Sequence, residues 1–125
     1  MKAQPGVKVA VLGASPKEDR FSFKAVRLLK QNGFQPIPVH PAGHTVDGID
    51  GLKSLTEITE SIDTLSMYVN SKISDGEKEN ILNLNPRRVV FNPGTENSGL
   101  AKVLEEAGIE VVENCTLIML NSGLF

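Results

Sequence analysis

The residues best suited to chemistry lie in one loop near the start of the chain. Gly13-Ala14-Ser15-Pro16-Lys17 follows a short apolar run, and Arg20 comes three residues later. A glycine allows a tight turn and close backbone approach, while a following helix start offers unpaired N–H groups and partial positive charge. The loop also carries a hydroxyl and two cations. These groups together predict a loop that binds a phosphate or pyrophosphate.

The glycine pattern of this loop differs from the dinucleotide fingerprint. The pattern G-x-G-x-x-G requires two further glycines, and this chain has Ser15 and Glu18 at those places. We therefore expect a phosphate-containing ligand other than NAD.

A second candidate position follows the strand predicted over residues 35–39. Val39-His40-Pro41 stands where an NAD site usually carries an acidic residue for the ribose 2′-OH. Because no acidic residue is present there, this position tolerates a phosphorylated ribose better than a usual NAD site does. His40 is a candidate ligand contact, and a structural or merely exposed histidine is the alternative. His44 is predicted to be exposed, and two histidines with one distant cysteine do not make a convincing metal site.

The elements that must position these residues alternate between strand and helix. Apolar runs predict strands over residues 7–12, 35–39, 64–69, 87–91 and 109–112. Helical spacing predicts helices that begin at Ser22, at Ser74 or Asp75, and at Ser98, with shorter helical pieces at 55–60 and 116–120. Such alternation implies parallel strands joined by right-handed crossovers. We predict an α/β, Rossmann-like three-layer sandwich with a five-stranded, mainly parallel sheet, as a single domain over residues 1–125.

In such a sheet, ligands bind outside the carboxyl ends of the strands. This rule directs attention to the loops after the third and fourth predicted strands. The candidates that it adds are Asn70, Ser71, Ile73, Asn92, Pro93, Gly94 and Thr95. Turn formation and helix capping also explain several of these residue types.

Composition restricts the class of protein. The chain has 125 residues and a formal net charge of −2, which gives no support to nucleic-acid binding or to a membrane surface. Its apolar runs are far shorter than the ~20 residues of a membrane span, and its first residues lack the apolar core of a signal peptide. One cysteine, Cys115, excludes an internal disulfide. We expect a cytoplasmic protein, and the apolar stretch 118–125 is either core or a homodimer surface.

At these residues the chain resembles the CoA-binding domain family, whose members are small stand-alone Rossmann-like proteins related to the CoA-binding part of the succinyl-CoA synthetase α subunit. The matching stretches include Val9–Pro16, Pro36–Pro41 and Ala107–Val112, and the resemblance covers nearly the whole chain. It implies that the first loop contacts the phosphates of CoA and that 39–41 lie beside the adenosine. It also implies that the loops at 70–73 and 92–95 border the rest of the ligand. Family members commonly have Asn where this chain has His40.

The leading hypothesis is therefore a protein that binds CoA or an acyl-CoA without catalysis of its own. CoA carries a pyrophosphate and a 3′-phosphorylated ribose, which suit the first loop and the missing acid after residue 39. The alternative is an NAD(P)-binding redox sensor or minimal oxidoreductase, because NADP satisfies the same two arguments. A third hypothesis is a thioester-processing enzyme that uses Glu96 or Cys115.

Overall fold

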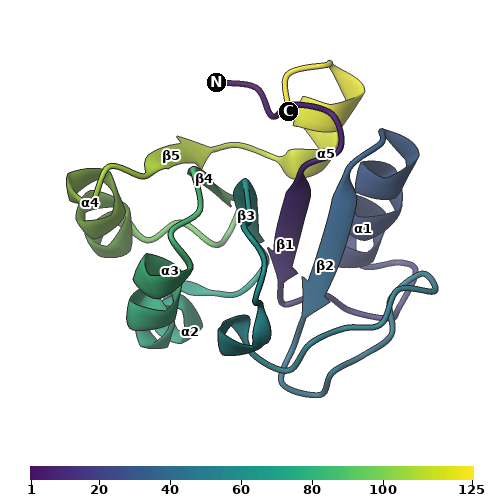
Figure 1. The fold of residues 1–125 in the computed structure, drawn as a ribbon, viewed down its shortest axis with the longest axis horizontal. Helices are drawn as coiled ribbons and strands as arrows, with labels where there is room; N and C mark the ends of the chain where they lie inside the picture. The colour runs from purple at the N-terminus through teal and green to yellow at the C-terminus, as the bar shows by residue number, and fades with distance from the viewer.

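A five-stranded sheet forms the centre of the computed structural model, which describes residues 1–125 (Figure 1). Its strands are β1 (Lys8–Leu12), β2 (Gln35–Val39), β3 (Thr64–Met67), β4 (Arg88–Phe91) and β5 (Glu110–Glu113). They lie in the order β2-β1-β3-β4-β5, and every pairing is parallel. The predicted Rossmann-like α/β fold is confirmed, with a sheet that is wholly rather than mainly parallel.

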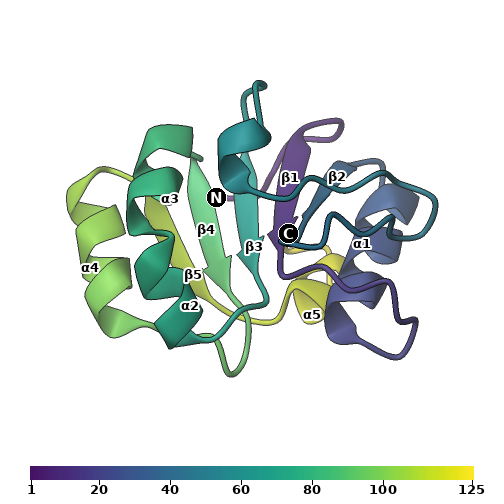
Figure 2. The ribbon, with the colours of Figure 1, turned by 90° about the horizontal axis from the view of Figure 1, so that it is seen from below.

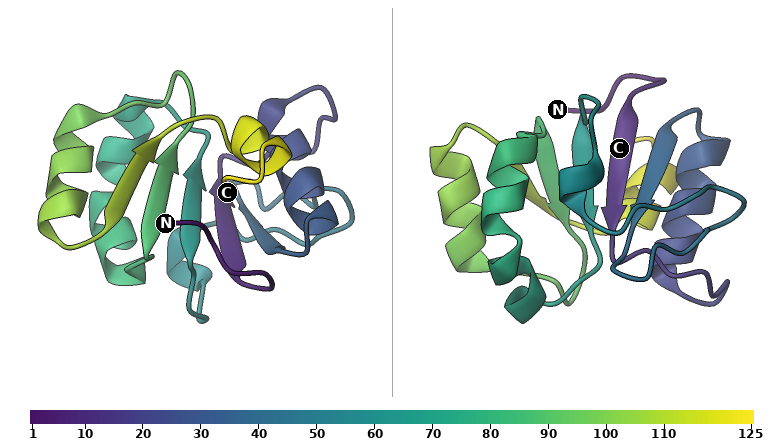
Figure 3. Two further views of the ribbon diagram at one scale, coloured as in Figure 1. Left: turned by 90° about the horizontal axis from the view of Figure 1, so that it is seen from above. Right: turned by 60° about the horizontal axis from the view of Figure 1, so that its bottom comes forward.

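Helices cover both faces of this sheet (Figure 2). One face carries α1 (Phe21–Gln31) and α5 (Thr116–Asn121). The other carries the 3-10 helix η1 (Leu55–Glu57), α2 (Ser71–Gly76), α3 (Lys78–Leu84) and α4 (Ser98–Glu106). Figure 3 shows the yellow α5 in front of the sheet in its left view and the green and teal helices in front of it in its right view. None of these helices combines the length and apolar character of a membrane-spanning helix.

Strand β1 is buried on both faces because it lies between β2 and β3 and helices cover each face of the sheet. Val9 and Val11 pack in the cluster beneath α1 and α5, whereas Ala10 and Leu12 pack in the cluster on the other face. This alternation explains why the strand is a continuous apolar run rather than an apolar–polar pattern. Its carboxyl end therefore has a rigid base from which the next loop leaves.

Strand β2 lies at the edge of the sheet. Pro36 and Pro38 stand opposite Val9 and Val11 in the register. A proline has no N–H to donate, so an edge strand is where it does least harm to the ladder. The edge position therefore explains how β2 tolerates two prolines.

Two predicted helix starts are wrong. Helix α1 begins at Phe21, and the hydroxyl of Ser22 accepts a hydrogen bond from the Ser15 N–H at 3.0 Å instead of capping the helix. The second helical region begins at Ser71, because the Asn70 side chain accepts from the Ile73 N–H and caps α2. In the second case Asn70, one turn before Ser74, had the same local signature as the predicted cap. In the first case a contact with Ser15 takes the hydroxyl that was expected to cap the helix. The predicted start of α4 at Ser98 is confirmed.

Candidate functional site

The strand order places a switch point at the carboxyl ends of β1 and β3. From β1 the chain passes to β2 on one side, and it then crosses to β3 on the other side. Loops that leave two such strands diverge, and the crevice between them is where ligands bind in open parallel sheets. The loop after β1 and the residues after β3 are therefore the first place to look for a site.

Gly13 is the residue that brings these two strand ends together. Its φ is +92°, and a Cβ at this position would lie 2.7 Å from the Tyr68 carbonyl oxygen and 2.9 Å from Val69 Cγ1. Both the left-handed conformation and the close approach require glycine. The sequence-based interpretation of Gly13 as a tight-turn residue with close backbone approach agrees with this geometry.

The backbone N–H groups of the loop are mostly occupied within the protein. Gly13 and Ala14 both donate to the Val39 carbonyl oxygen, at 2.8 and 3.3 Å. Ser15 donates to Ser22 Oγ, and Lys17 donates to Ser15 Oγ at 3.1 Å. These loop amides hold the loop against β2 and α1.

The start of α1 offers the open backbone donors instead. This helix has 11 residues, and its N-cap residue, Arg20, makes no side-chain hydrogen bond to the first turn. The first N–H groups of a helix have no partner within the helix, and together with the helix dipole they favour an anion. The open backbone donors of this region therefore lie at the junction of the loop with α1, where the sequence placed them.

A hollow of about 330 Å³ lies at this junction. Four of its lining residues were predicted from the sequence: Gly13, Ser15, Lys17 and Arg20. Three were missed: Phe21, Ser22 and Tyr68. Tyr68 is the chain's one tyrosine and directly follows β3, a position that could have drawn attention to it.

Lys17 and Arg20 give this hollow its charge. Both side chains are exposed, and neither lies within ion-pair distance of a carboxylate. The next cations along α1 are different, because Arg27 and Lys30 both bind Asp47 at 2.9 Å. The two unpaired cations at the mouth of the hollow are free to meet an anionic ligand.

Tyr68 lines the hollow, but its hydroxyl lies in the interior. Its hydroxyl is buried and has no hydrogen-bond partner. Burial is the main reason that the pKa of this phenol is raised to about 12. The buried hydroxyls of Thr116 and Ser66 act in the opposite direction on this pKa, so the phenol O–H lies among interior groups.

The end of β2 contacts the first loop through its backbone more than through its side chains. Val39 is 1% exposed and belongs to the core, so its carbonyl, rather than its side chain, meets the neighbouring loop. His40 is half-buried, and Pro41 is exposed. Burial, and next the proximity of His44, lower the pKa of His40.

The predicted contact residues after β3 are exposed to solvent, whereas those after β4 are partly buried. Asn70, Ser71 and Ile73 are exposed, although the Asn70 side chain is engaged in capping α2. Asn92 and Thr95 are buried, and the Thr95 hydroxyl donates to the Asn92 carbonyl oxygen. What the loop after β4 exposes is the turn at Pro93 and Gly94.

The Asn92 side chain joins three elements in the interior. Its Nδ2 donates to Ser66 Oγ at 3.0 Å and to the Met67 carbonyl oxygen at 2.8 Å. Its Oδ1 accepts from the Thr116 N–H at 2.8 Å. All the hydrogen-bonding groups of the Asn92 side chain are used within the protein, so this residue has a structural role. Ala14 is fully buried and likewise has a structural role.

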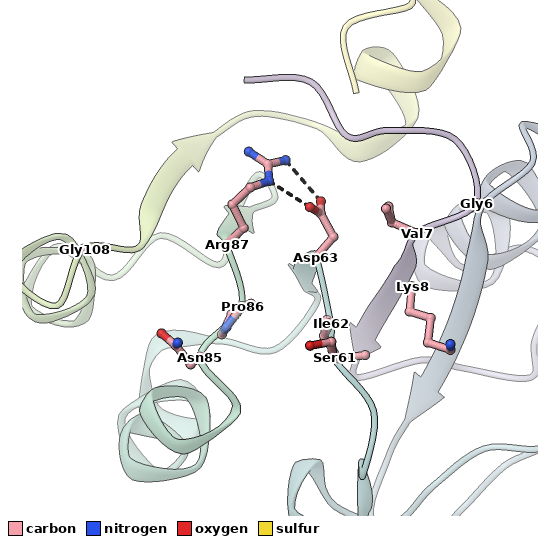
Figure 4. Close-up of a pocket in the computed structure, with 10 residues that line it drawn as sticks. All are labelled: Gly6, Val7, Lys8, Ser61, Ile62, Asp63, Asn85, Pro86, Arg87 and Gly108. Atoms are coloured by element: carbon pink, nitrogen blue, oxygen red, sulfur yellow. Dashed lines mark hydrogen bonds and ion pairs between the residues drawn. The ribbon is translucent and has the colours of Figure 1, made fainter.

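The largest hollow, about 600 Å³, lies at the opposite, amino end of the strands (Figure 4). Arg87 Nε and NH2 bind the two carboxylate oxygens of Asp63 at 2.7 and 3.1 Å, and Arg87 NH1 binds Glu110 at 3.0 Å. Lys8 is paired with Glu60. Because its charged side chains are all in ion pairs within the protein, this hollow has fewer free charged groups for a ligand than the smaller hollow has.

A wholly parallel five-stranded sheet covered by helices on both faces defines a Rossmann-like α/β domain. Within that class, the chain belongs to the CoA binding domain family, whose profile matches residues 7–121.

Several proteins resemble this chain over most of its length. The uncharacterized protein YneT of Bacillus subtilis is 28% identical over 109 residues, which cover 87% of this chain and 81% of YneT. A crystal structure of an uncharacterized protein is 39% identical, with a TM-score of 0.92 over 98% of this chain and 100% of that one. A Thermus thermophilus protein is 29% identical, with a TM-score of 0.87 over 96% of this chain and 91% of that one.

Proposed function

We propose that this protein binds CoA or an acyl-CoA at the carboxyl edge of its sheet. Membership of the CoA binding domain family supports CoA as the ligand class. The observation that carries the placement is the pair of unpaired cations, Lys17 and Arg20, beside the uncapped start of α1. Cations and helix N–H groups together suit the pyrophosphate of this ligand.

The residues around the hollow add a close strand contact and an apolar ring to its charge. Gly13 lets the ends of β1 and β3 approach each other, because a Cβ there would meet the Tyr68 carbonyl oxygen. Phe21 is 67% exposed at the rim of the hollow, where an apolar ring can cover part of a bound molecule. The half-buried His40 and the exposed residues at 41, 70–73 and 93–94 border the same edge and are proposed as further contacts.

We propose further that binding is not followed by catalysis. The seven residues that line the hollow include no carboxylate, imidazole or thiol. Glu96, which was weighed as a base, accepts a hydrogen bond from the Gly94 N–H at 2.9 Å within its own turn.

Thermal unfolding with a matched set of ligands tests this proposal. CoA, 3′-dephospho-CoA, acetyl-CoA, NAD and NADP are compared at equal concentrations. A ligand present at ~100 times its Kd stabilises the fold by about 2.7 kcal/mol, which is a readable shift in Tm. We expect CoA or acetyl-CoA to stabilise most. Stabilisation by NADP alone would support the redox alternative, and no shift with any of the five would overturn the proposal.

A further inference from the structure

The turn between α1 and β2 holds the only asparagine of the chain that is followed by glycine. The sequence has nine asparagines, and Asn32-Gly33 is the one pair of this kind. Asparagine is a thermolabile residue, because its side-chain amide can be lost to the next backbone nitrogen. A following glycine has no Cβ to hinder that approach. Asn32 is therefore the asparagine of this chain most prone to lose its amide.

This turn is open to water in the folded protein. Asn32 and Gly33 are both exposed, and nothing lies within 4 Å of a Cβ added at Gly33. Asn32 also lines a hollow of about 450 Å³ beside residues 2–5 and 120–125. The turn lies at the end of α1 opposite the candidate site, so its chemistry is independent of the proposed function (Figure 1).

Two hydrogen bonds occupy the groups that would react. Asn32 is the C-cap residue of α1, and its Nδ2 donates to the Leu28 carbonyl oxygen at 2.7 Å. The Gly33 N–H donates to the Lys30 carbonyl oxygen at 3.2 Å. Both bonds must break before the Gly33 nitrogen can bond to Asn32 Cγ. The last turn of α1 must therefore open before the amide can be lost.

One contact from outside the helix limits this opening. Helix ends fray, and local opening at such places needs much less free energy than global unfolding. Lys30 holds the last turn of α1, because its Nζ binds Asp47 Oδ2 at 2.9 Å and the Asp47 carbonyl oxygen at 3.0 Å. Since Lys30 is two residues before Asn32 and also supplies the acceptor for Gly33, this contact restrains the reacting turn.

We propose that Asn32 is a deamidation site whose rate is set by the opening of the last turn of α1. The Gly33 nitrogen bonds to Asn32 Cγ and closes a cyclic imide, while the bond from Cγ to Nδ2 breaks. The proton of the Gly33 N–H ends on the leaving nitrogen, which departs as ammonia. Water then opens the imide at either carbonyl and leaves aspartate or isoaspartate at position 32. The reaction consumes water and releases ammonia, and it needs no oxidant or reductant.

The product fits the turn less well than Asn32 does. A carboxylate cannot donate to the Leu28 carbonyl, and it adds negative charge at the negative end of the helix dipole. Isoaspartate also adds a methylene to the backbone shortly before Phe34, whose ring packs edge-on against Phe125 with centroids 5.3 Å apart. Deamidation therefore loosens the connection between α1 and β2, and it does so irreversibly.

Peptide mapping by mass spectrometry during incubation at neutral pH follows the conversion. The parent protein, its urea-unfolded chain and two variants are compared. Lys30→Gly removes the contact with Asp47 and weakens the last turn of α1. Lys102→Gly, the control, makes the same change at an exposed position of α4. Asn121, which is exposed at the end of α5 and followed by serine, is the internal reference in every sample.

We expect conversion at Asn32 and none at Asn121. The native protein should convert several-fold more slowly than the unfolded chain, and Lys30→Gly should convert several-fold faster than the parent. Lys102→Gly should match the parent, and the Tm of each variant checks that its fold is retained.

Three results would overturn the proposal. The first is an Asn32 that stays intact in the native protein while the unfolded chain converts. The second is an equal rate in the parent and in Lys30→Gly. The third is an equal acceleration in Lys102→Gly, because global unfolding rather than opening of α1 would then set the rate.

Discussion

Gly13 and Tyr68 stand in direct backbone contact, so that a Cβ on Gly13 would meet the Tyr68 carbonyl oxygen at 2.7 Å. The two residues leave the ends of neighbouring strands, β1 and β3, at the switch point of the sheet. The contact closes the floor of the hollow that both residues line. A single atom added at Gly13 should therefore disturb both the fold and the candidate site.

Gly13→Ala should lower stability more than the matched change Gly33→Ala. Both glycines have a positive φ, at +92° and +85°, but nothing lies within 4 Å of a Cβ added at Gly33. The left-handed conformation alone costs about 1–2 kcal/mol, and Gly13→Ala adds the clash with backbone atoms. Urea unfolding of both variants measures the difference. Equal losses would show that the loop relaxes without strain.

Replacing Lys17 and Arg20 together by Ala should weaken CoA binding strongly with little change in stability. Each charged hydrogen bond to a phosphate contributes about 1.5–3 kcal/mol. The control removes two exposed lysines on the helices of the other face, Lys78 and Lys102, so that the net charge changes equally. Calorimetric titration compares the two double variants. If both double variants bind CoA with equal affinity, Lys17 and Arg20 do not contact the ligand.

Tyr68→Phe should leave the unliganded protein as stable as before, because the buried hydroxyl has no partner to lose. Because that hydroxyl is buried away from the hollow, CoA affinity should fall by less than the ~0.5–1.5 kcal/mol that a lost neutral hydrogen bond contributes. Thermal unfolding and titration of the same variant separate the two effects. A large loss of stability would mean that the hydroxyl is bonded within the fold.

Asn92→Ala should destabilise the protein by about 2 kcal/mol or more. Its removal leaves the buried N–H of Thr116 without an acceptor and opens space beside Ser66, and an unpaired buried polar group costs about 1–3 kcal/mol. Asn70→Ala, which removes a solvent-exposed helix cap, should cost about 1 kcal/mol. Urea unfolding ranks the two variants, and the reverse order would contradict the structural part given to Asn92.

Asp63 should make stability depend on pH at the amino end of the strands. Burial raises the pKa of this carboxyl, but the hydrogen bonds from Arg87 and Thr64 outweigh burial, and the net result is a lowered pKa. The pKa of this carboxyl in the unfolded chain is near 3.8. At any pH above that value the ionised carboxylate stabilises the folded protein, and this stabilisation is lost as the pH falls through the lower pKa of the folded state.

Comparison with Asp63→Asn measures this contribution. The parent protein should be the more stable at neutral pH, and its advantage should shrink as the pH falls well below that of an ordinary aspartate. Unfolding by urea at a series of pH values follows the difference. An advantage that does not change with pH would contradict the ion pair with Arg87.

The sequence by itself determined the elements and the glycine turn. The alternation of apolar runs with helical spacing specified five parallel strands, and the strand–glycine–cation pattern at 7–20 located the loop that lines the hollow. These are local properties, because a strand or helix period and a glycine turn depend on residues close together in the chain.

Only the tertiary structure decided which donors in that region are free. The loop amides donate to the Val39 carbonyl and to Ser22 Oγ, and the buried Asn92 side chain accepts from the Thr116 N–H. Tyr68, which follows β3, lines the hollow together with the loop after β1. Each of these outcomes depends on a partner at least seven residues away, and most on one more than twenty away. Periodicity carries no information about such partners, since strand order and packing choose them.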